Sequence, residues 1–172
     1  MRADTIRLAR IGAAGWLAIA TLAAVVQAAG LPSVEPKLLP PEDAFRFSAR
    51  AIDARTIEAR FDIADGYYLY RDKFAFETGP DVGVGAPDLP AGHRKHDAFF
   101  GDVETYRGRI VVRVPLSRAT PGQSIVLKAA SQGCADAGVC YPPSVQQVSL
   151  ALPAAGAPPG PVVEPRRKGL FN

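Results

Sequence analysis

The residues best suited to chemistry are Cys134 and Cys140, which are the only cysteines in this 172-residue chain and have five residues between them. The residues between them include Ala135, Ala137 and Gly138, whose small size lets two thiols approach to bonding distance at a hairpin tip. A bridge that closes so short a loop stabilises a fold by only about 2 kcal/mol, against about 4.7 kcal/mol for a loop of ~100 residues. The pair is therefore better placed for making and breaking a disulfide than for stapling the fold.

The N-terminus has the pattern of a secretory signal peptide. Three arginines precede an apolar run from Ile11 to Val26, and Val26-Gln27-Ala28 offers a small-x-small cleavage site. We predict a signal peptide over residues 1–28, with an uncleaved anchor as the alternative, although the run is shorter than the ~20 residues that span a bilayer. In the oxidising space that export implies, two cysteines are expected to pair.

Charge and composition argue against several classes of partner. The net charge of +3 falls to +1 once residues 1–28, with three arginines and one aspartate, are removed. The basic residues are scattered and lack interleaved aromatic side chains, so we predict no nucleic-acid partner. His93 and His96 together with the cysteines offer the ligand types of a metal site, but Arg94 and Lys95 separate the histidines, and we predict no metal and no cofactor.

Alternating apolar residues predict the elements that position the cysteines. Five segments alternate with a period of two, which indicates β-strands with one buried face, and no segment after residue 28 has the stripe of an amphipathic helix. The strands are separated by turns such as Asp65-Gly66 and Thr120-Pro121-Gly122, which favours an antiparallel β-sandwich. The inward residues of the five segments are Phe45/Phe47/Ala49, Ile57/Ala59/Phe61/Ile63, Ile110/Val112/Val114, Ile125/Leu127/Ala129 and Val148/Leu150/Leu152.

We predict one domain over residues 38–152, an extended lead-in over 29–37 and an Ala/Pro/Gly-rich linker or tail over 153–172. An immunoglobulin domain of the usual kind has a disulfide between strands far apart in sequence, and Cys134 and Cys140 are too close for that role. The apolar faces of the sheets must therefore hold this fold together.

Three separated segments carry a resemblance to a known family. Asp65–Arg71 (DGYYLYR), Asp97–Gly101 (DAFFG) followed by Glu104 and Tyr106-Arg107, and Gln132–Pro143 (QGCADAGVCYPP) resemble the N-terminal periplasmic domain of the thiol:disulfide interchange protein DsbD. The resemblance covers residues 38–152 and implies an all-β, immunoglobulin-like antiparallel sandwich with a redox hairpin and a cap loop.

The resemblance also implies the reaction. Members of the family are periplasmic protein-disulfide reductases that use no cofactor: a thioredoxin-like donor domain reduces them, and they reduce periplasmic disulfide isomerases and the thioredoxin-like protein of cytochrome c maturation. By position, Cys140 forms the mixed disulfides and Cys134 closes the internal bond. We expect a monomer that makes transient complexes and contacts a membrane only through a further domain.

The same resemblance implies which residues surround the cysteines. Asp97–Gly101 would be the cap loop, in which the ring of Phe99 covers the disulfide and Gly101 supplies backbone freedom. Tyr68 and Tyr70 would line the site, and Asp97 and Glu104 would tune the local field. Two positions depart from the family pattern: Ala98 replaces an acidic residue and Phe100 replaces a tyrosine.

A second class of function stays open on the residues alone. The chain would then be an exported binding or assembly module of the β-sandwich type, with a permanent hairpin disulfide and an interface elsewhere. Under that reading Tyr67, Tyr68 and Tyr70 pack in a half-buried strand without a chemical role. Replacing Cys140 separates the two classes, because only a relay depends on it for forming mixed disulfides.

Overall fold

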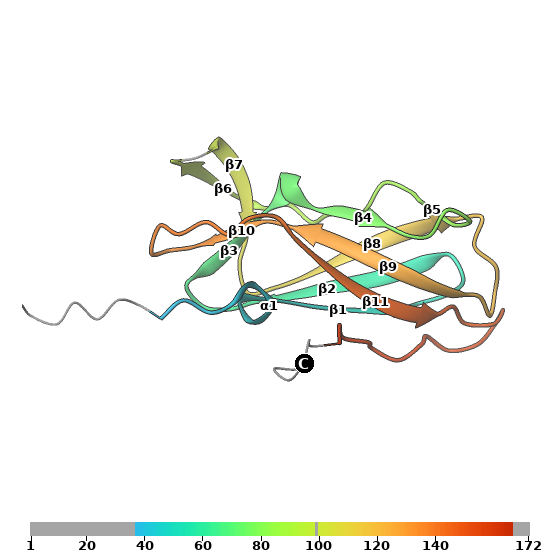
Figure 1. The fold of residues 1–172 in the computed structure, drawn as a ribbon. Coiled ribbons are helices and arrows are strands. Elements are labelled where there is room, and N and C mark those ends of the chain that lie inside the picture. The colour runs from blue at the N-terminus through green and yellow to red at the C-terminus, as the bar shows by residue number, and fades with distance from the viewer. Residues whose placement is uncertain (1–36, 99, 167–172) are drawn as a thin grey trace, which may run out of the picture. The chain divides into compact units, whose positions relative to one another are not determined.

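Residues 37–98 and 100–166 are described by a computed structural model, and their regular structure is almost all β (Figure 1). The predicted signal peptide, most of the lead-in, Phe99 and the last six residues of the predicted tail lie outside the described residues. One helical turn, α1 (Pro41–Ala44), precedes the first strand, where the sequence predicted no helix. Pro41 explains it, because proline is well suited to the first position of a helix.

The strands all pair antiparallel and form three sheets, of order β1-β2-β8-β5, β10-β3-β7-β6 and β11-β9-β4. Their bounds are β1 (Phe45–Ala51), β2 (Thr56–Ile63), β3 (Tyr67–Tyr70), β4 (Ala75–Glu77), β5 (Gly83–Val84), β6 (His93–Asp97), β7 (Gly101–Tyr106), β8 (Arg109–Ser117), β9 (Ser124–Ser131), β10 (Gly133–Ala135) and β11 (Ser144–Ala151), with a 3-10 turn, η1 (Arg71–Lys73), after β3. The predicted antiparallel sandwich is confirmed.

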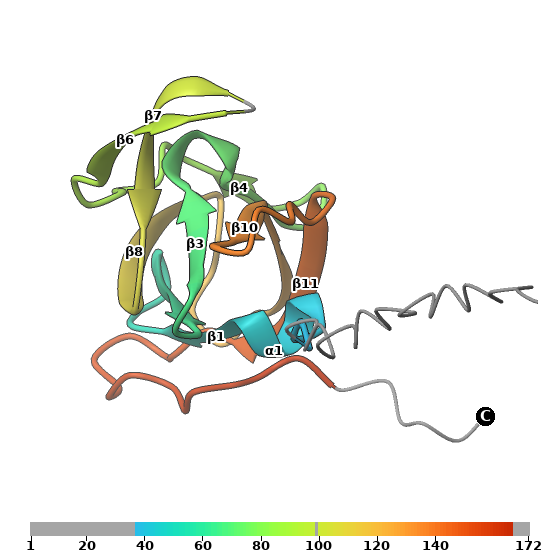
Figure 2. The same ribbon diagram turned by 90° about the vertical axis from the view of Figure 1, so that its left-hand side faces the viewer.

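The core lies between the sheets and is built by the alternation that the sequence shows. On β8 every second side chain is buried, and on β2 the buried residues are Ile57, Ala59, Phe61 and Ile63. In the end-on view of Figure 2, β8 and β11 lie on opposite sides of this interior. All five strands predicted from alternation are present, as β1, β2, β8, β9 and β11.

The predicted linker or tail makes backbone contacts with the domain. Ala49 and Val163 exchange hydrogen bonds of 2.9 and 2.8 Å, and the amide of Gly160 donates to the carbonyl of Ala51 at 2.8 Å. These bonds take up part of the free edge of β1, which would otherwise present unpaired backbone groups to solvent.

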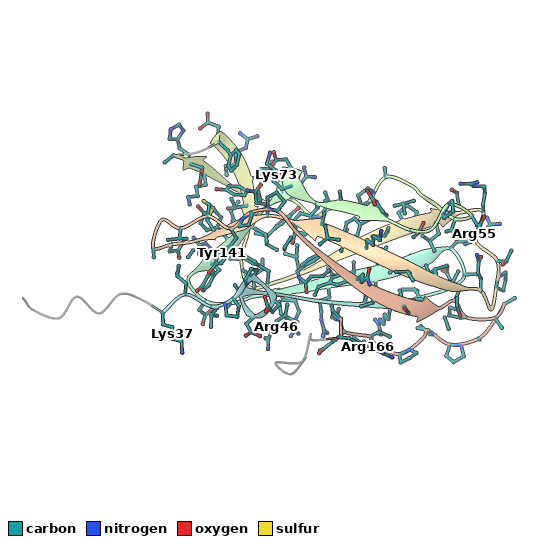
Figure 3. The ribbon with its side chains drawn as sticks, in the orientation of Figure 1. Lys37, Arg46, Arg55, Lys73, Tyr141 and Arg166 are labelled. Atoms are coloured by element: carbon teal, nitrogen blue, oxygen red, sulfur yellow. A yellow bond between two sulfur atoms is a disulfide. The ribbon has the colours of Figure 1, made fainter. Side chains whose placement is uncertain are left out.

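The sheet β10-β3-β7-β6 lies at one end of the sandwich and holds the segments that the sequence singled out (Figure 1). β3 carries Tyr68 and Tyr70, β10 carries Cys134, and the hairpin of β6 and β7 contains the predicted cap loop. Lys73 and Tyr141 lie toward this end, whereas Arg55 lies at the other (Figure 3).

Candidate functional site

Cys134 and Cys140 form the predicted disulfide, with Cα atoms 4.0 Å apart. They face each other across an antiparallel bridge. On either side of the bridge, the amide of Tyr141 donates to the carbonyl of Gly133 at 3.0 Å and the amide of Ala135 donates to the carbonyl of Val139 at 2.8 Å. The cysteines thus occupy a non-hydrogen-bonded pair, where antiparallel strands bring side chains closest. The hairpin backbone holds the sulfur atoms together.

The two cysteines differ in exposure. Cys134 is completely buried, while Cys140 is only partly buried. Residues 136–139, which form the hairpin tip, are all exposed. Thiol–disulfide exchange requires direct access to the attacked sulfur, so an incoming thiolate meets Cys140 first.

Two tyrosines of β3 flank the disulfide on one face of the strand. The hydroxyl of Tyr70 lies 3.1 Å from Sγ of Cys134 and 3.9 Å from Sγ of Cys140. In the disulfide neither sulfur carries a proton, so the hydroxyl is the donor. Burial raises the pKa of Tyr70 above its ordinary value, and the neighbouring Tyr68 and Asp97 raise it further. Tyr70 therefore remains a protonated donor throughout the physiological range.

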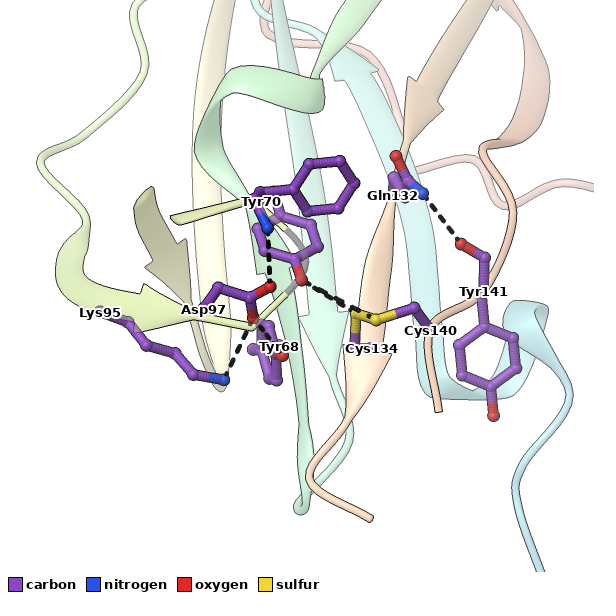
Figure 4. The surroundings of a disulfide bond; sticks show 9 residues. Tyr68, Tyr70, Lys95, Asp97, Gln132, Cys134, Cys140 and Tyr141 are labelled. Carbon is purple, nitrogen blue, oxygen red and sulfur yellow. Dashed lines mark hydrogen bonds and ion pairs between the residues drawn. A yellow bond between two sulfur atoms is a disulfide. The ribbon is translucent and has the colours of Figure 1, made fainter. Parts of the chain in front are cut away.

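Asp97 connects this pair to the predicted cap. Its side chain is buried and accepts a hydrogen bond of 2.9 Å from the hydroxyl of Tyr68 and one of 3.3 Å from the amide of Phe100 (Figure 4). Nζ of Lys95 lies 3.6 Å from the same carboxylate and 3.6 Å from the centre of the Tyr68 ring. A buried carboxylate requires such compensation, and the Tyr68 hydroxyl, the Phe100 amide and Lys95 supply it.

The predicted cap loop is the turn between β6 and β7, since Asp97 ends one strand and Gly101 begins the next. Gly101 has φ of +72°, a conformation that suits glycine. The ring of Phe100 packs edge-on against that of Tyr70 at 5.0 Å, with Nζ of Lys73 4.8 Å from its centre. Phe100 is nevertheless 42% exposed, so part of its ring faces solvent.

Not every predicted residue joins this cluster. Glu104 pairs with Nε of Arg71 at 3.3 Å and accepts a hydrogen bond from the amide of Gly92. His96 pairs with Asp102 at 2.8 Å on the exposed surface of the β6–β7 hairpin. Within the described residues, no three His, Cys, Asp or Glu side chains gather as a metal site would require.

Three basic residues around the site were not foreseen: Lys73, Lys95 and Arg107. Arg107 makes a two-pronged ion pair with Asp136 of the hairpin tip, donates at 3.2 Å to the carbonyl of Tyr67, and lies 5.2 Å from the centre of the Tyr68 ring. This ion pair holds the pKa of Asp136 below its ordinary value. Local sequence patterns do not reveal cation–π pairs between strands that are distant in sequence. Of these three basic residues, only Arg107 lies in a family motif, Tyr106-Arg107.

None of the helices in the described part of the chain has the length and apolar content needed to cross a bilayer. The sequence and the fold were also compared with known proteins. A family model described as "Thiol:disulfide interchange protein DsbD, N-terminal" matches residues 35–152.

Among curated proteins, the DsbD of Ralstonia nicotianae is 46% identical over 147 residues, and DsbD 1 of Pseudomonas aeruginosa is 38% identical over 137 residues. These alignments cover 84% and 76% of this chain but only 23% of each relative, so the chain spans less than a quarter of their length.

Two solved structures share the fold. The reduced N-terminal domain of Neisseria meningitidis DsbD has a TM-score of 0.64 and 35% identity, covering 75% of this chain and 96% of that one. The complex between the DsbD and PilB N-terminal domains of the same organism matches with a TM-score of 0.58 and 34% identity, covering 76% and 95%. These neighbours confirm the predicted immunoglobulin-like fold. This chain belongs to the family of DsbD N-terminal domains.

Proposed function

We propose that this domain is a periplasmic electron relay. It accepts electrons from a thioredoxin-like donor domain and passes them to disulfides of periplasmic partners, among them disulfide isomerases and the thioredoxin-like protein of cytochrome c maturation. The observation that carries the proposal is the disulfide held by one short hairpin, with one partly exposed sulfur and one buried sulfur. The signal-peptide pattern of residues 1–28 supports the location.

In the first half-reaction the donor's thiolate attacks Sγ of Cys140. The Cys134–Cys140 bond breaks, and Cys134 leaves as a thiolate and takes up a proton. The donor's second thiolate then attacks its own sulfur in the mixed disulfide, so that Cys140 leaves as a thiolate and the donor departs as a disulfide. Two electrons have then moved to the domain.

In the second half-reaction the thiolate of Cys140 attacks a disulfide of the acceptor. Cys134 then attacks Sγ of Cys140, which releases the acceptor as a dithiol and restores the internal bond. The greater exposure of Cys140 supports its role as the residue that meets both partners, and the burial of Cys134 supports its role as the resolving residue. The complex of the neisserial relative with a PilB domain supports transient docking of a partner protein.

The residues around the sulfurs would keep the dithiol from wasteful oxidation. The turn that contains Phe99 and Phe100 acts as the cap, and Phe100 packs on Tyr70, whose hydroxyl bonds Cys134. The buried carboxylate of Asp97 disfavours a nearby thiolate, because like charges repel at short distance in a medium of low dielectric constant. The dithiol would thus react slowly until a docked partner displaces the cap.

The first test is the reduction potential of the couple, measured by equilibrating the domain with glutathione and dithiothreitol buffers and counting free thiols. We expect a value between about −270 and −180 mV, the range of thioredoxin and the disulfide isomerases. A value well below about −300 mV would mark a structural bond and overturn the proposal.

Trapping of mixed disulfides tests which cysteine attacks the partner and which one resolves the mixed disulfide. Cys134→Ala should accumulate a mixed disulfide with a thioredoxin-like partner through Cys140, because the resolving thiol is missing. Cys140→Ala is the matched control and should trap little or nothing, since its remaining thiol is buried. Equal trapping by the two variants would refute the assignment.

A further inference from the structure

Two tyrosines of the family-like motifs have no part in the chemistry described so far. Tyr67 lies on the face of β3 opposite to Tyr68 and Tyr70, and Tyr141 directly follows Cys140. Their rings lie 6.2 Å apart, and each packs edge-on against Phe45, at 6.0 and 5.7 Å. They therefore join the residue after the reactive cysteine to the main core.

Both hydroxyls bond the same residue of the short segment before α1. The amide of Leu39 donates to the hydroxyl of Tyr67 at 2.8 Å, and the hydroxyl of Tyr141 donates to the carbonyl of Leu39 at 2.7 Å. We call Tyr67, Leu39 and Tyr141 the tyrosine clamp. It ties β3, the segment before α1 and the second limb of the redox hairpin, which begins at Cys140, into one unit.

The backbone of Tyr141 is held as well. Its amide donates to the carbonyl of Gly133 at 3.0 Å, and Nε2 of Gln132 donates to its carbonyl at 3.2 Å (Figure 4). On the other side of Cys140, residues 136–139 of the hairpin tip are exposed. The second limb of the hairpin is thus anchored to the core at its Tyr141 end.

We propose that Tyr141 is a positioning residue for Cys140, acting through the tyrosine clamp. The inference rests on the proposed exchange reaction. In the mixed disulfide the Cys134–Cys140 bond is broken, so the fold of the hairpin must keep Sγ of Cys140 within reach of Cys134. The clamp holds the second limb in place during that interval. It therefore raises the effective concentration of the Cys134 thiolate at the Cys140 sulfur, which speeds resolution and favours the internal disulfide.

The test compares Tyr141→Phe with a matched control, Tyr106→Phe. Tyr106 is buried, whereas Tyr141 is only partly buried, but Tyr106 likewise donates from its hydroxyl to a distant backbone carbonyl, that of Pro90. Each variant keeps its ring and loses one hydroxyl bond, and because Tyr106 is the more buried of the two, Tyr106→Phe should lose at least as much thermal stability. Only Tyr141→Phe should change the exchange chemistry.

Two readouts separate positioning from stability. The first is the equilibrium constant for reduction by glutathione, which we expect Tyr141→Phe to raise at least threefold, a shift of about +14 mV in potential. The second uses the reduced domain and the disulfide reagent dithiobis(nitrobenzoate). Cys140 releases one nitrothiobenzoate as it forms the mixed disulfide, and Cys134 releases the second as it resolves it. The second phase should slow at least threefold in Tyr141→Phe and stay unchanged in Tyr106→Phe.

Different results would refute the proposed relay and the positioning role of Tyr141. Absence of the second phase in the unaltered domain would refute the relay itself. A normal second phase there, with equal values for the two variants, would overturn the role of Tyr141 alone. A chain begun at Pro40 lacks the Leu39 carbonyl but keeps Tyr141, and it should match Tyr141→Phe in both readouts. Behaviour like that of the unaltered domain would exclude the clamp as the means of positioning.

Discussion

Replacing Tyr70 with phenylalanine should raise the pKa of the Cys134 thiol in the reduced domain. Tyr70 and Cys134 are both completely buried, and the hydroxyl lies 3.1 Å from the sulfur. Burial disfavours a thiolate here, and a hydrogen bond from the Tyr70 hydroxyl to the Cys134 sulfur offsets part of that cost. Phenylalanine keeps the ring and its packing on Phe100 and removes only this donor.

The size of the effect follows from the charge of the acceptor. A hydrogen bond to a charged group contributes about 1.5–3 kcal/mol, and one pKa unit corresponds to about 1.4 kcal/mol. The pKa of Cys134 should therefore rise by about 1–2 units. Since a thiolate of higher pKa is also more nucleophilic, part of the loss is recovered, and the resolving step at pH 7 should slow by about three- to tenfold.

The assay uses Cys140→Ala, which leaves Cys134 as the only thiol of the chain. The thiolate of Cys134 is titrated by its ultraviolet absorbance in this variant, with and without Tyr70→Phe. Tyr106→Phe in the same background is the control, because its hydroxyl donates to the carbonyl of Pro90 and not to a sulfur. A Cys134 pKa within ~0.3 units of the parent would refute the reasoning, since it would mean that the hydroxyl does not stabilise the thiolate.

Three further predictions concern the cap, the hairpin and its ion pair. Phe100→Ala should speed the reaction of the disulfide with a small thiol several-fold, because the ring packs over Tyr70, while Val126→Ala, an exposed site on β9, should not. Gly133→Ala should cost about 1–3 kcal/mol in urea unfolding, because an added Cβ would meet the Tyr68 carbonyl and lie 2.8 Å from the Phe45 ring; Gly79→Ala, with open space around it, is the control. Asp136→Asn should remove about 0.5 kcal/mol of stability at pH 7, since the ion pair is half-exposed. Because Arg107 lowers the pKa of Asp136 from 3.8, this contribution is complete above that pH and lost as the pH falls below it; an equal effect of the variant at pH 2 and pH 7 would count against the ion pair.

The strands that form the core were predictable because each has one buried face. β2 and β8 alternate strictly between buried and more exposed side chains, and a period of two is a local property of the chain. The shorter strands β4, β5 and β10 have two or three residues each, too few for alternation to be recognised. α1 is a single turn, too short for an apolar stripe.

The disulfide was likewise predictable, since five intervening residues with a glycine allow a hairpin to bring its own cysteines together. The grouping of Tyr68 and Tyr70 on one face of a strand also follows from a period of two. The family motifs marked Asp97 and the turn after it, although their position against β3 depends on the pairing of β3 with β7 and of β7 with β6.

By itself, then, the sequence determined the strand faces, the pairing of the cysteines and the family, because each can be recognised from short stretches of sequence without knowing how they pack. The tertiary structure alone decided which sulfur is buried, which hydroxyl bonds it, and that Glu104 pairs with Arg71. It also decided that Leu39 meets Tyr141 across 102 positions of sequence. Contacts of this kind depend on how the sheets pack on one another, and local periodicity contains no information about that packing.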